Sequence, residues 1–421
     1  MKAQTEQDAN LISVDVAIVG GAMAGATLAL GLKGLSDSLK RPLKIALIEA
    51  HHPNQDHPGF DARSIAIAHG SIFELTRLGL WPKLAHLGTP IDNIHISDRG
   101  HMGMTELNAE AFNLHHLGQV VELERVGQVL FKLLSEADIS LYCPNKLASV
   151  EAKVDAQLLT LDDGTRLRTS LLVAADGVNS QVRAAFKQPL KQVDFDQVAL
   201  VANIELAQVE IDKTNESWAY ERFTQHGPLA LLPMSPVKGI QRKSLVWALS
   251  PDEALRLLCV TKDQFLDELQ QAFGSRAGQF TAVGERYSYP LMLSYMPKPI
   301  YHRTVFIGNA AQTLHPIAGQ GFNLGLRDLV SLIQVIEQTL LDETDTEPAD
   351  FGSTQVTYGY LHSRESDRNN TIRNIEFLVR GFSNDYWPLV VGRNLGLRML
   401  SWLPPLKTPV ARIAMGWKAI S

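Results

Sequence analysis

The sequence has little cysteine and no large excess of charge. Its 421 residues include two cysteines, Cys143 and Cys259, too few for a disulfide framework or a four-cysteine zinc site, so a reduced compartment is the simpler expectation. Lysine and arginine total 39 against 45 acidic residues, a formal net charge of −6, which argues against a nucleic-acid binder that relies on bulk electrostatics. We expect no metal site, because His51, His52 and His57 lie in a proline-containing loop without a rigid ligand spacing.

The chain also lacks a convincing membrane or export segment. Residues 16–32 carry no charge, but 17 residues lie at the lower edge of what a membrane-spanning helix needs, and glycines interrupt them. Lys2 is outnumbered by Glu6 and Asp8, and this N-terminus is not rich in arginine, so neither a signal peptide nor a mitochondrial transit peptide is predicted. We expect a cytoplasmic protein, either free or peripherally bound at the inner face of a bacterial cytoplasmic membrane.

Apolar residues make up 45% of the chain, which is enough for a full core, and the length favours more than one domain. The order of strand and helix patterns predicts an α/β fold, in which a Rossmann-like dinucleotide-binding domain is split by an inserted antiparallel-sheet domain. The first part of the dinucleotide domain is expected at residues 1–185, the inserted substrate domain at 186–300, the return segment at 301–345 and a helical C-terminal region at 346–421.

Local patterns place elements within these segments. A helix is expected at residues 63–80, ended by Pro82, and another at residues 262–273. The more exposed strands of the inserted domain are expected at residues 198–206, 218–223, 229–233 and 244–249.

A glycine-rich turn follows the first predicted strand, residues 13–19, and opens a βαβ unit. The residues of this turn, whose backbone N–H groups are expected to approach a pyrophosphate, are Gly20, Gly21, Ala22, Met23, Ala24 and Gly25. Glu49 closes the second strand, where an acid accepts hydrogen bonds from an adenosine ribose. The dinucleotide fingerprint has glycine where Ala22 stands, and the added Cβ either crowds the phosphate or is accommodated by Gly21. The alternative is a tight turn without a ligand.

Two further predicted strands end in glycine-containing turns. Asp176 and Gly177 follow the strand at residues 171–175 and, by themselves, indicate an ordinary turn. Gly308 and Asn309 follow a strand near residue 307 and lead to a second glycine-rich helix start, whose N-terminus suits an anionic or electron-rich ring edge. The residues of that helix start are Gly319, Gln320, Gly321, Phe322 and Asn323.

The loop before this helix holds the only acid–base candidate, and no catalytic residue is certain. His315 is suitably placed as a general base, but it equally suits a cap for the loop that Pro316 stiffens.

Together the three motifs resemble those of flavoprotein aromatic monooxygenases that carry a single FAD-binding domain, over nearly the whole chain. In that family the first motif holds the ADP half of FAD, the Asp-Gly motif shapes the flavin and reductant region, and the third motif holds the ribityl chain. The segments at 95–101, 221–230, 308–328 and 388–394 resemble more narrowly the 2-octaprenyl-6-methoxyphenol hydroxylase type of bacterial ubiquinone synthesis. The wider family has aspartate where Asn309 stands, whereas the narrower group has asparagine.

The resemblance implies residue roles and a reaction. Arg63, Arg125 and Gln128 match positions near the FAD phosphates and ribityl chain, although the residues alone indicate ordinary surface charge on helices. The implied reaction uses NAD(P)H to reduce FAD, after which O₂ adds at the flavin C4a and the hydroperoxide transfers one oxygen to a phenol ring. The side chains expected to cover that ring and exclude water are Phe223, Leu231 and Pro233 of the inserted sheet.

The implied substrate is a polyprenyl phenol, whose apolar tail needs an apolar path to the site. Apolar residues near the C-terminus suit contact with a membrane or with another ubiquinone-biosynthesis protein, and packing on the protein's own core is an equal alternative. These residues are Trp387, Leu395, Leu397, Met399, Leu400, Trp402 and Leu403.

Other functions remain open at this stage. A flavin halogenase or prenyl reductase shares the fold, although the sequence has no Trp-x-Trp pair of the halogenase type. A plain NAD-dependent dehydrogenase would use the first motif alone. The chain could also be another hydroxylase of the same pathway, or a non-catalytic, flavin-poor member of a biosynthetic assembly whose flavin site Ala22 impairs.

Overall fold

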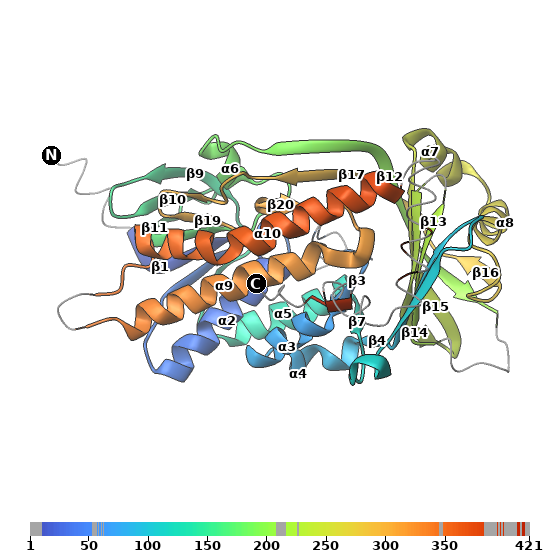
Figure 1. Cartoon of the computed structure of the whole chain (residues 1–421). Coiled ribbons are helices and arrows are strands. Elements are labelled where there is room, and N and C mark those ends of the chain that lie inside the picture. The colour runs from blue at the N-terminus through green and yellow to red at the C-terminus, as the bar shows by residue number, and fades with distance from the viewer. Residues whose placement is uncertain are drawn as a thin grey trace.

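Two bodies lie side by side along the long axis of the molecule (Figure 1), one built on a largely parallel sheet and the other on an antiparallel sheet. Two long helices run lengthwise across the first body towards the second. The computed structural model describes residues 11–52, 57, 59, 61, 63–207, 216–224, 227–344 and 348–382, and near the C-terminus residues 394, 396, 399, 411–412 and 415–416.

The first sheet carries the predicted βαβ unit. Its strands are β1 (Leu11–Val19), β2 (Ile45–Ile48), β8 (Ser140–Tyr142), β9 (Leu147–Ala152), β10 (Gln157–Leu161), β11 (Arg166–Ala174), β18 (Ile300–Tyr301) and β19 (Thr304–Phe306). The order β18-β19-β11-β1-β2-β8 is parallel from β19 to β8, and the β9–β10 hairpin extends it beside β11. Parallel strands are covered on both faces. Val16 and Ile18 therefore lie in the core on one face of the sheet, and Ala17 and Val19 lie in the core on the other face.

Helices cover one face of this sheet and short elements cover the other. The helices that share a core with Val16 and Ile18 are α2 (Met23–Leu39), α3 (His69–Arg77), α4 (Trp81–Leu84), α5 (Leu123–Glu136) and α9 (Gln320–Leu341). The opposite face is closed by the β9–β10 hairpin and α6 (Gln181–Ala185). This layered α/β arrangement is the fold class that the sequence predicts.

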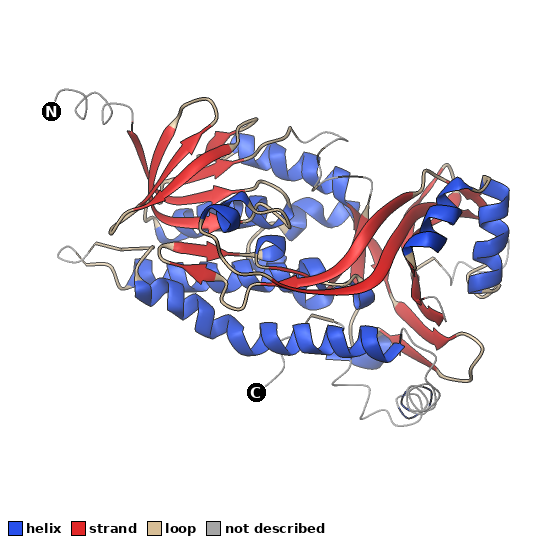
Figure 2. Cartoon of the chain, turned by 90° about the horizontal axis from the view of Figure 1, so that it is seen from above, coloured by secondary structure: helices blue, strands red, loops and turns tan. Residues whose placement is uncertain are grey.

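The second sheet is antiparallel except where β13 meets β5. Its strands are β5 (Asn93–Asp98), β6 (Met104–Asn108), β12 (Lys191–Leu206), β13 (Trp218–Thr224), β14 (Gly227–Val237), β15 (Ile240–Leu249), β16 (Phe280–Val283), β17 (Tyr287–Tyr295) and β20 (Gln312–Thr313). The order is β20-β17-β12-β15-β14-β13-β5-β6, with β16 on β12. Helices α7 (Pro251–Cys259) and α8 (Lys262–Phe273) cover its outer face at the far end of the molecule (Figure 2).

The predicted elements of the inserted domain are confirmed, but the domain recruits an earlier segment. The four expected strands lie within β12, β13, β14 and β15, and α8 has the predicted bounds, with Thr261 and Gln264 forming a capping box at its start. Strands β5 and β6, however, come from residues 93–108, well before the segment 186–300. Strand β5 pairs with the edge of β13, which would otherwise leave a row of unpaired backbone groups, and β6 pairs with β5.

One predicted helix is wrong in its first part. Residues 63–80 begin as strand β3 (Ser64–Ala68), and α3 starts only at His69. The run Ser-Ile-Ala-Ile-Ala alternates in the manner of a strand, and β3 pairs with β7 (Gly118–Glu122), which also pairs with β4 (Thr89–Ile91). Pro82 does not end this helix but lies in the first turn of α4.

The last long element is α10 (Thr354–Phe382), which packs along α9 (Figure 1). The remaining elements are single 3₁₀ turns, η1 (Ala85–Leu87), η2 (Glu110–Phe112), η4 (Gly308–Ala310) and η5 (Ile317–Gly319). Within the described part of the chain, no helix is long and apolar enough to cross a membrane.

The structure only partly places the apolar C-terminal residues. Met399 is 44% exposed, and Ala411 and Met415 pack in a small core with Ile91 and Ala219. The other members of that apolar group lie outside the described residues: Trp387, Leu395, Leu397, Leu400, Trp402 and Leu403.

Candidate flavin site

The three glycine-containing motifs meet at one edge of the first sheet. Strands β1, β11 and β19 are parallel neighbours, so their carboxyl ends lie together. The Ala175 N–H donates to Val19 O (2.8 Å), and the Ile307 N–H donates to Ala174 O (3.0 Å). Gly20, Asp176 and Gly308 therefore follow three adjacent strand ends, and the structure brings the predicted constellations together.

Two glycines of the first turn allow very close backbone packing. Gly20 has φ +101°, and a Cβ there would lie 2.4 Å from Ala175 O. A Cβ on Gly25 would lie 1.8 Å from Gly20 O. Helix α2 thus begins against the turn and against β11, and no larger residue fits at either position.

Ala22 causes no internal conflict at this turn. It is the N-cap residue of α2, with extended backbone (φ −69°, ψ −169°), and a Cβ on Gly59 would lie 2.5 Å from the Ala22 Cβ. The missing side chain of Gly59 leaves room for the Ala22 methyl, and the effect of Ala22 on a bound phosphate stays a prediction. No side chain caps α2, and its first turn contains no acid, so the N–H groups of that turn remain suited to a phosphate.

Glu49 is buried and already bound by the protein. Its carboxylate accepts from the Gly21 N–H (2.5 Å) and the His51 N–H (2.8 Å), and His57 Nε2 lies 3.3 Å away. Burial raises the pKa of Glu49, but the hydrogen bonds from His57, His51 and Gly21 outweigh it and leave the pKa below its ordinary value. The anion ties the second strand to the glycine turn, and its contact with a ribose stays a prediction.

Asp176 presents a buried carboxylate oxygen without a partner. Its Oδ2 accepts from the Val182 N–H (3.2 Å), whereas Oδ1 has no hydrogen-bond partner among the described residues. Burial raises the pKa of this carboxyl. Gly177 follows with φ +81°, which favours glycine. An orphaned acceptor beside Gly20 suits a ligand donor.

The backbone of the third motif is fixed by close contacts, whereas the side chain of Asn309 remains available to a ligand. Gly308 has φ +56°, and its N–H donates to Asp328 Oδ2 (3.3 Å). A Cβ on Gly325 would lie 3.2 Å from the Gly308 Cα, so α9 approaches the turn closely. Asn309 itself is exposed and makes no hydrogen bond to the described residues.

A buried ionic cluster supports this turn from below. Asp328 and Arg364 are both fully buried and joined by a 2.9 Å contact between Oδ1 and Nε. Arg364 and Arg327 also bond Asp367 Oδ2, at 2.5 and 2.9 Å. Burial favours neutral forms, but Asp328 and Asp367 keep the pKa of Arg364 above its ordinary value.

The buried ionic cluster of Asp328 and Arg364 extends to Gln312, which follows the Gly308 turn. Gln312 Nε2 donates to Asp328 Oδ2 (2.5 Å), and Arg368 Nε donates to Gln312 Oε1 (2.6 Å). Arg368 Nη2 also donates to Met296 O (2.8 Å) and Ala311 O (3.2 Å). Helix α10 therefore fixes both ends of the Gly308 turn, through residues to which the sequence analysis assigned no role. The available signal was the spacing of Tyr360, Arg364 and Arg368, which places them on one helical face.

The start of α9 combines an open backbone with a fixed side chain. Gly319 has φ +60°, and a Cβ on Gly321 would meet nothing within 4 Å. Asn323 Oδ1 accepts from the Ala68 N–H (3.0 Å) and Ser71 Oγ (2.7 Å), and its Nδ2 donates to Ala66 O and Gly319 O. Asn323 thus anchors the helix start to β3 and α3. Gln320 is buried and Phe322 half-buried, and their contact with a cofactor stays a prediction.

The geometry of His315 favours its capping role over proton transfer. The imidazole is 1% exposed, its Nδ1 accepts from the Ile317 N–H (3.2 Å), and its Nε2 lies 3.3 Å from Gln197 Oε1. These contacts place the proton on Nε2. Burial lowers the pKa of His315 to about 4, so the ring is neutral at pH 7. Pro316, in contrast, is exposed.

The three residues matched to the FAD phosphates and ribityl chain lie in two places, Arg63 in the loop before β3 and the other two on α5. Arg63 Nε donates to Asp61 Oδ1 (2.7 Å), and the guanidinium lies 4.9 Å over the Tyr289 ring. Arg125 and Gln128 are exposed on one face of α5, where Arg125 lies 3.8 Å from Glu122. Their contact with a cofactor stays a prediction.

The three predicted ring-covering residues do not share a face. Phe223 packs with Leu314, Ile317 and Leu324 of the loop and α9. Leu231 pairs with Tyr220 and belongs to the outer core under α8, and Pro233 lies two residues further on the same side. The grouping is therefore corrected, because strand alternation turns Leu231 and Pro233 away from the loop and leaves Phe223 towards it.

These residues fit a bound FAD. The evidence is the close glycine packing at Gly20 and Gly25, the uncapped start of α2, the orphaned Asp176 Oδ1 and the open backbone at Gly321. Among the described residues, no group of three histidine, cysteine or acidic side chains could hold a metal ion.

Comparisons with known proteins show the family of the chain. Residues 13–350 match the family described as FAD binding domain. The chain is 33% identical to ubiquinone hydroxylase UbiL of Rhodospirillum rubrum, over 96% of this chain and 89% of that protein. It is 29% identical to 3-demethoxyubiquinol 3-hydroxylase of Escherichia coli, over 96% and 98% of the two chains.

Solved structures share the fold. PqsL of Pseudomonas aeruginosa, described as a probable FAD-dependent monooxygenase, matches 92% of this chain and 99% of its own with a TM-score of 0.72 at 17% identity. From the matched family and the UbiL identity, we conclude that the chain belongs to the FAD-dependent monooxygenase family that contains the ubiquinone-biosynthesis hydroxylases.

Proposed function

We propose that this protein hydroxylates the ring of a polyprenyl phenol in ubiquinone biosynthesis, with a substrate of the 2-polyprenyl-6-methoxyphenol type, using O₂ and NAD(P)H. The observation that carries the proposal is a shared apolar cluster between the second sheet and the loop of the third glycine motif. Phe223 of β13 lies in one buried cluster with Leu314 and Ile317 of the loop that leads to α9. A ring held at that junction would meet a flavin and an apolar wall together.

FAD would be held along the three strand ends. The first turn of α2 would take the pyrophosphate, Asn309 and the Gly308 turn the ribityl chain, and the Asp176 carboxylate a donor of the cofactor. Bound FAD supplies the redox chemistry, by accepting a hydride from NAD(P)H and activating O₂ at its C4a carbon. No second dinucleotide fingerprint is evident in the sequence, so NAD(P)H would visit the same flavin transiently.

The start of α9 would supply electrostatic stabilisation. Its backbone at Gly321 faces open space, and the helix is 22 residues long with no acid in its first turn. N–H groups at such a terminus carry partial positive charge and favour negative charge on the ring edge in front of them. Asn323 holds this terminus in place through its four hydrogen bonds.

The apolar cluster around Phe223 would exclude water. It includes Leu293 of β17 and, from α10, Ile372, Ile375 and Val379, all buried. Such a wall protects an oxygen-transferring centre from hydrolytic side reactions. The same surface suits the first isoprene units of a tail.

The relatives' names do not decide which ring carbon reacts. One is a 3-demethoxyubiquinol 3-hydroxylase, and another is named only as a ubiquinone hydroxylase. Another hydroxylase of the same pathway is therefore the second candidate. A non-catalytic, flavin-poor assembly member would need an impaired pyrophosphate turn, and the flavin content of the purified protein distinguishes it from the hydroxylase.

The first experiment is an absorbance spectrum of the purified protein, followed by addition of NAD(P)H with and without a short-tailed prenyl phenol. We expect a yellow protein whose reduction and oxygen consumption accelerate with the phenol, and mass spectrometry of the product would identify the carbon. A protein that stays colourless with added FAD would contradict the proposal. If the Ala22→Gly variant then bound FAD, the loss of flavin binding would be assigned to Ala22 in the glycine turn.

A further inference from the structure

Described residues of three segments outside the glycine motifs meet at one turn. The segments are residues 95–101, 221–230 and 388–394, of which Asn394 is described in the last. Strand β5 pairs with β13, and beyond the pairing the Arg99 N–H donates to Phe223 O (2.8 Å). Asn394 Nδ2 donates to Asp98 Oδ2 (2.8 Å), and Asn394 Oδ1 accepts from the Gly103 N–H (2.7 Å). Asn394 is thus fastened to the β5–β6 turn.

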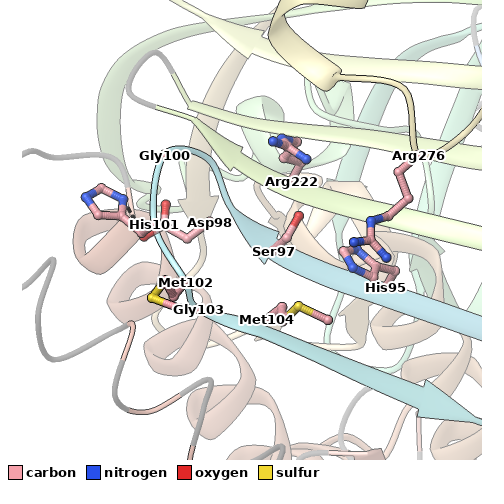
Figure 3. A pocket seen from close by; sticks show the side chains of 10 residues that line it. All are labelled: His95, Ser97, Asp98, Gly100, His101, Met102, Gly103, Met104, Arg222 and Arg276. Carbon is pink, nitrogen blue, oxygen red and sulfur yellow. Dashed lines mark ion pairs between the residues drawn. The ribbon is translucent and has the colours of Figure 1, made fainter.

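A cavity of about 220 Å³ lies at this turn (Figure 3). Its walls come from β5, the turn itself, Arg222 of β13 and Arg276 of the loop after α8. The side chains of His95, Ser97 and the two arginines lie around it in Figure 3. The cavity is therefore polar and open to solvent.

The cavity lies on the face of β13 that points away from the flavin-side cluster. Successive strand residues point to opposite faces. Phe223 packs on the loop before α9, whereas the Arg222 guanidinium lies 5.9 Å over the Phe273 ring of α8. A ligand in this cavity would be separate from the ring that is hydroxylated.

The positive charges around the cavity are not neutralised by ion pairs. Among the described residues, Arg99, Arg222 and Arg276 have no carboxylate within 4 Å, and the buried Arg222 Nε has no hydrogen-bond partner. Burial lowers the pKa of Arg222, and Arg99 and Arg276 lower it further, while Asp98 opposes them. Two guanidinium groups, of Arg222 and Arg276, line one opening without a carboxylate partner, which indicates a missing anion.

A buried histidine faces the same space. His95 is 2% exposed, its Nε2 has no hydrogen-bond partner among the described residues, and the nearest carboxylate, Glu106, is 3.9 Å away. Burial and then the two arginines lower its pKa to about 4, so the ring is neutral and able to donate or accept one hydrogen bond. An unpartnered buried donor beside free guanidinium groups suits an oxyanion.

The one acid in the wall is already engaged. Asp98 Oδ2 accepts from Asn394 and lies 3.3 Å from His101 Nδ1. Two methionines of the turn, Met102 and Met104, are 74% and 42% exposed and lie at the cavity rim. Exposed apolar side chains around a cationic hollow match a surface that is apolar below an anionic layer.

We propose that this cavity binds a phosphate group through Arg222 and Arg276, and that the source of the phosphate is an anionic phospholipid headgroup. Guanidinium groups bind phosphate oxygens with two parallel N–H donors, and the Ser97 hydroxyl and His95 ring stand ready for the remaining oxygens. The exposed methionines would enter the bilayer surface beside the headgroup. This site orients the protein at a membrane and does not depend on the hydroxylation proposed above.

The test is co-sedimentation of the FAD-loaded full chain with vesicles of phosphatidylglycerol and with vesicles of phosphatidylcholine. We expect binding to phosphatidylglycerol, and we expect Arg276→Gln to weaken it at least about fivefold, since one arginine near an anionic surface contributes about 1 kcal/mol. The matched control is Arg256→Gln on α7, which removes the same charge from the same sheet domain but from a position paired with Glu253 and Glu268.

A second experiment measures the binding of inorganic phosphate to the same proteins by titration calorimetry. Phosphate binding that Arg276→Gln and Arg222→Gln abolish, without preference for phosphatidylglycerol, would keep the phosphate site and overturn the lipid source. No binding in either experiment, or an equal loss of binding in Arg256→Gln, would overturn the site.

Flavin absorbance checks that each variant is folded. Arg276 is exposed, so it stays informative if the more buried Arg222 variant does not fold. None of these readouts measures hydroxylation, so the outcome is independent of the proposed reaction.

Discussion

Arginines cluster at two places in this molecule, and the two clusters differ in whether carboxylates of the protein pair with them. Under the Gly308 turn, Arg327, Arg364 and Arg368 are buried, and each donates hydrogen bonds to a carboxylate, amide or carbonyl oxygen of the protein. At the β5–β6 turn, Arg222 and Arg276 have no carboxylate within 4 Å among the described residues. Arg327 and Arg364 of the first cluster have carboxylates of the protein within bonding distance, at Asp328 and Asp367, and support a backbone turn, although Arg364 Nη2 has no hydrogen-bond partner among the described residues. The second lacks its anion and therefore has the character of a binding site.

The comparison also separates two uses of rigidity. The flavin end is built from close backbone contacts, in which a single Cβ does not fit. The turn at the other end has Gly100, with φ +79° and nothing within 4 Å of an added Cβ, and an exposed rim. Four substitutions test this contrast, from the largest expected effect to the smallest.

The largest effect is expected from Gly25→Val. Its Cβ would lie 1.8 Å from Gly20 O, so the start of α2 has to move away from the pyrophosphate turn. We expect loss of FAD retention, measured by the ratio of flavin to protein absorbance. The control is Gly34→Val on the same helix, where an added Cβ meets nothing within 4 Å. Normal flavin content in Gly25→Val would contradict the placement of the cofactor.

Breaking the paired cluster should come next. Arg364→Ala leaves Asp328 buried without its cation, and removal of one partner from a buried pair costs about 3–5 kcal/mol. Urea unfolding measures that loss, together with release of FAD as the Gly308 turn loosens. Arg380→Ala on the same helix removes an exposed arginine that pairs with Glu376, and should change stability by about 0.5 kcal/mol or less. Equal losses of stability in Arg364→Ala and Arg380→Ala would contradict the structural role of the buried pair.

The loop before α9 predicts a dependence on pH. His315 has a pKa near 4 in the folded protein against an ordinary value of 6.5, so the unfolded chain binds more protons between these values and stability falls as the pH drops through that window. We expect the wild type to lose about 3 kcal/mol more than His315→Gln between pH 6.5 and 4. Glutamine retains an acceptor for the Ile317 N–H. Parallel urea-unfolding profiles for the two proteins would show that His315 is not a buried neutral ring.

The smallest effect on stability is expected in the unpaired cluster. Arg276→Gln removes one of several repelling charges, so we expect unfolding free energy to change by about 0.5 kcal/mol or less. The pKa of His95 should rise, because Arg276 is one of the groups that lowers it. Histidine resonances followed by NMR across pH 3–7 measure that rise. A clear destabilisation would mean that Arg276 has a structural partner after all.

The sequence predicted the first βαβ unit and the turns at its strand ends well because their signals are local. A glycine turn between a strand and a helix, followed by an acid on the next strand, requires no knowledge of the rest of the chain. The same applies to α8, whose capping box lies within four consecutive residues. In contrast, residues 63–80 were predicted as helix because their apolar pattern was read without the partner strand β7.

Other features depend on contacts between distant segments. Leu231 and Pro233 have the right chemistry to cover a ring, but the register of β14 against β13 turns them under α8. Asp328 was visible in the third motif, yet its role depends on Arg364, 36 residues later. Segments 95–101 and 388–394 could be recognised as unusual, but nothing local indicates that Asn394 binds Asp98.

By itself, the sequence determined the α/β class, the three glycine motifs and the class of cofactor, a dinucleotide, that the first motif suits, because backbone conformation and helix-end charge are local properties; FAD followed from the family resemblance. Only the tertiary structure decided which side chains those motifs meet. It joined α10 to the Gly308 turn, set the faces of the substrate sheet and gathered arginines at the β5–β6 turn. Burial, strand register and the balance of charge are sums over residues far apart in the chain, and they exist only once the chain has folded.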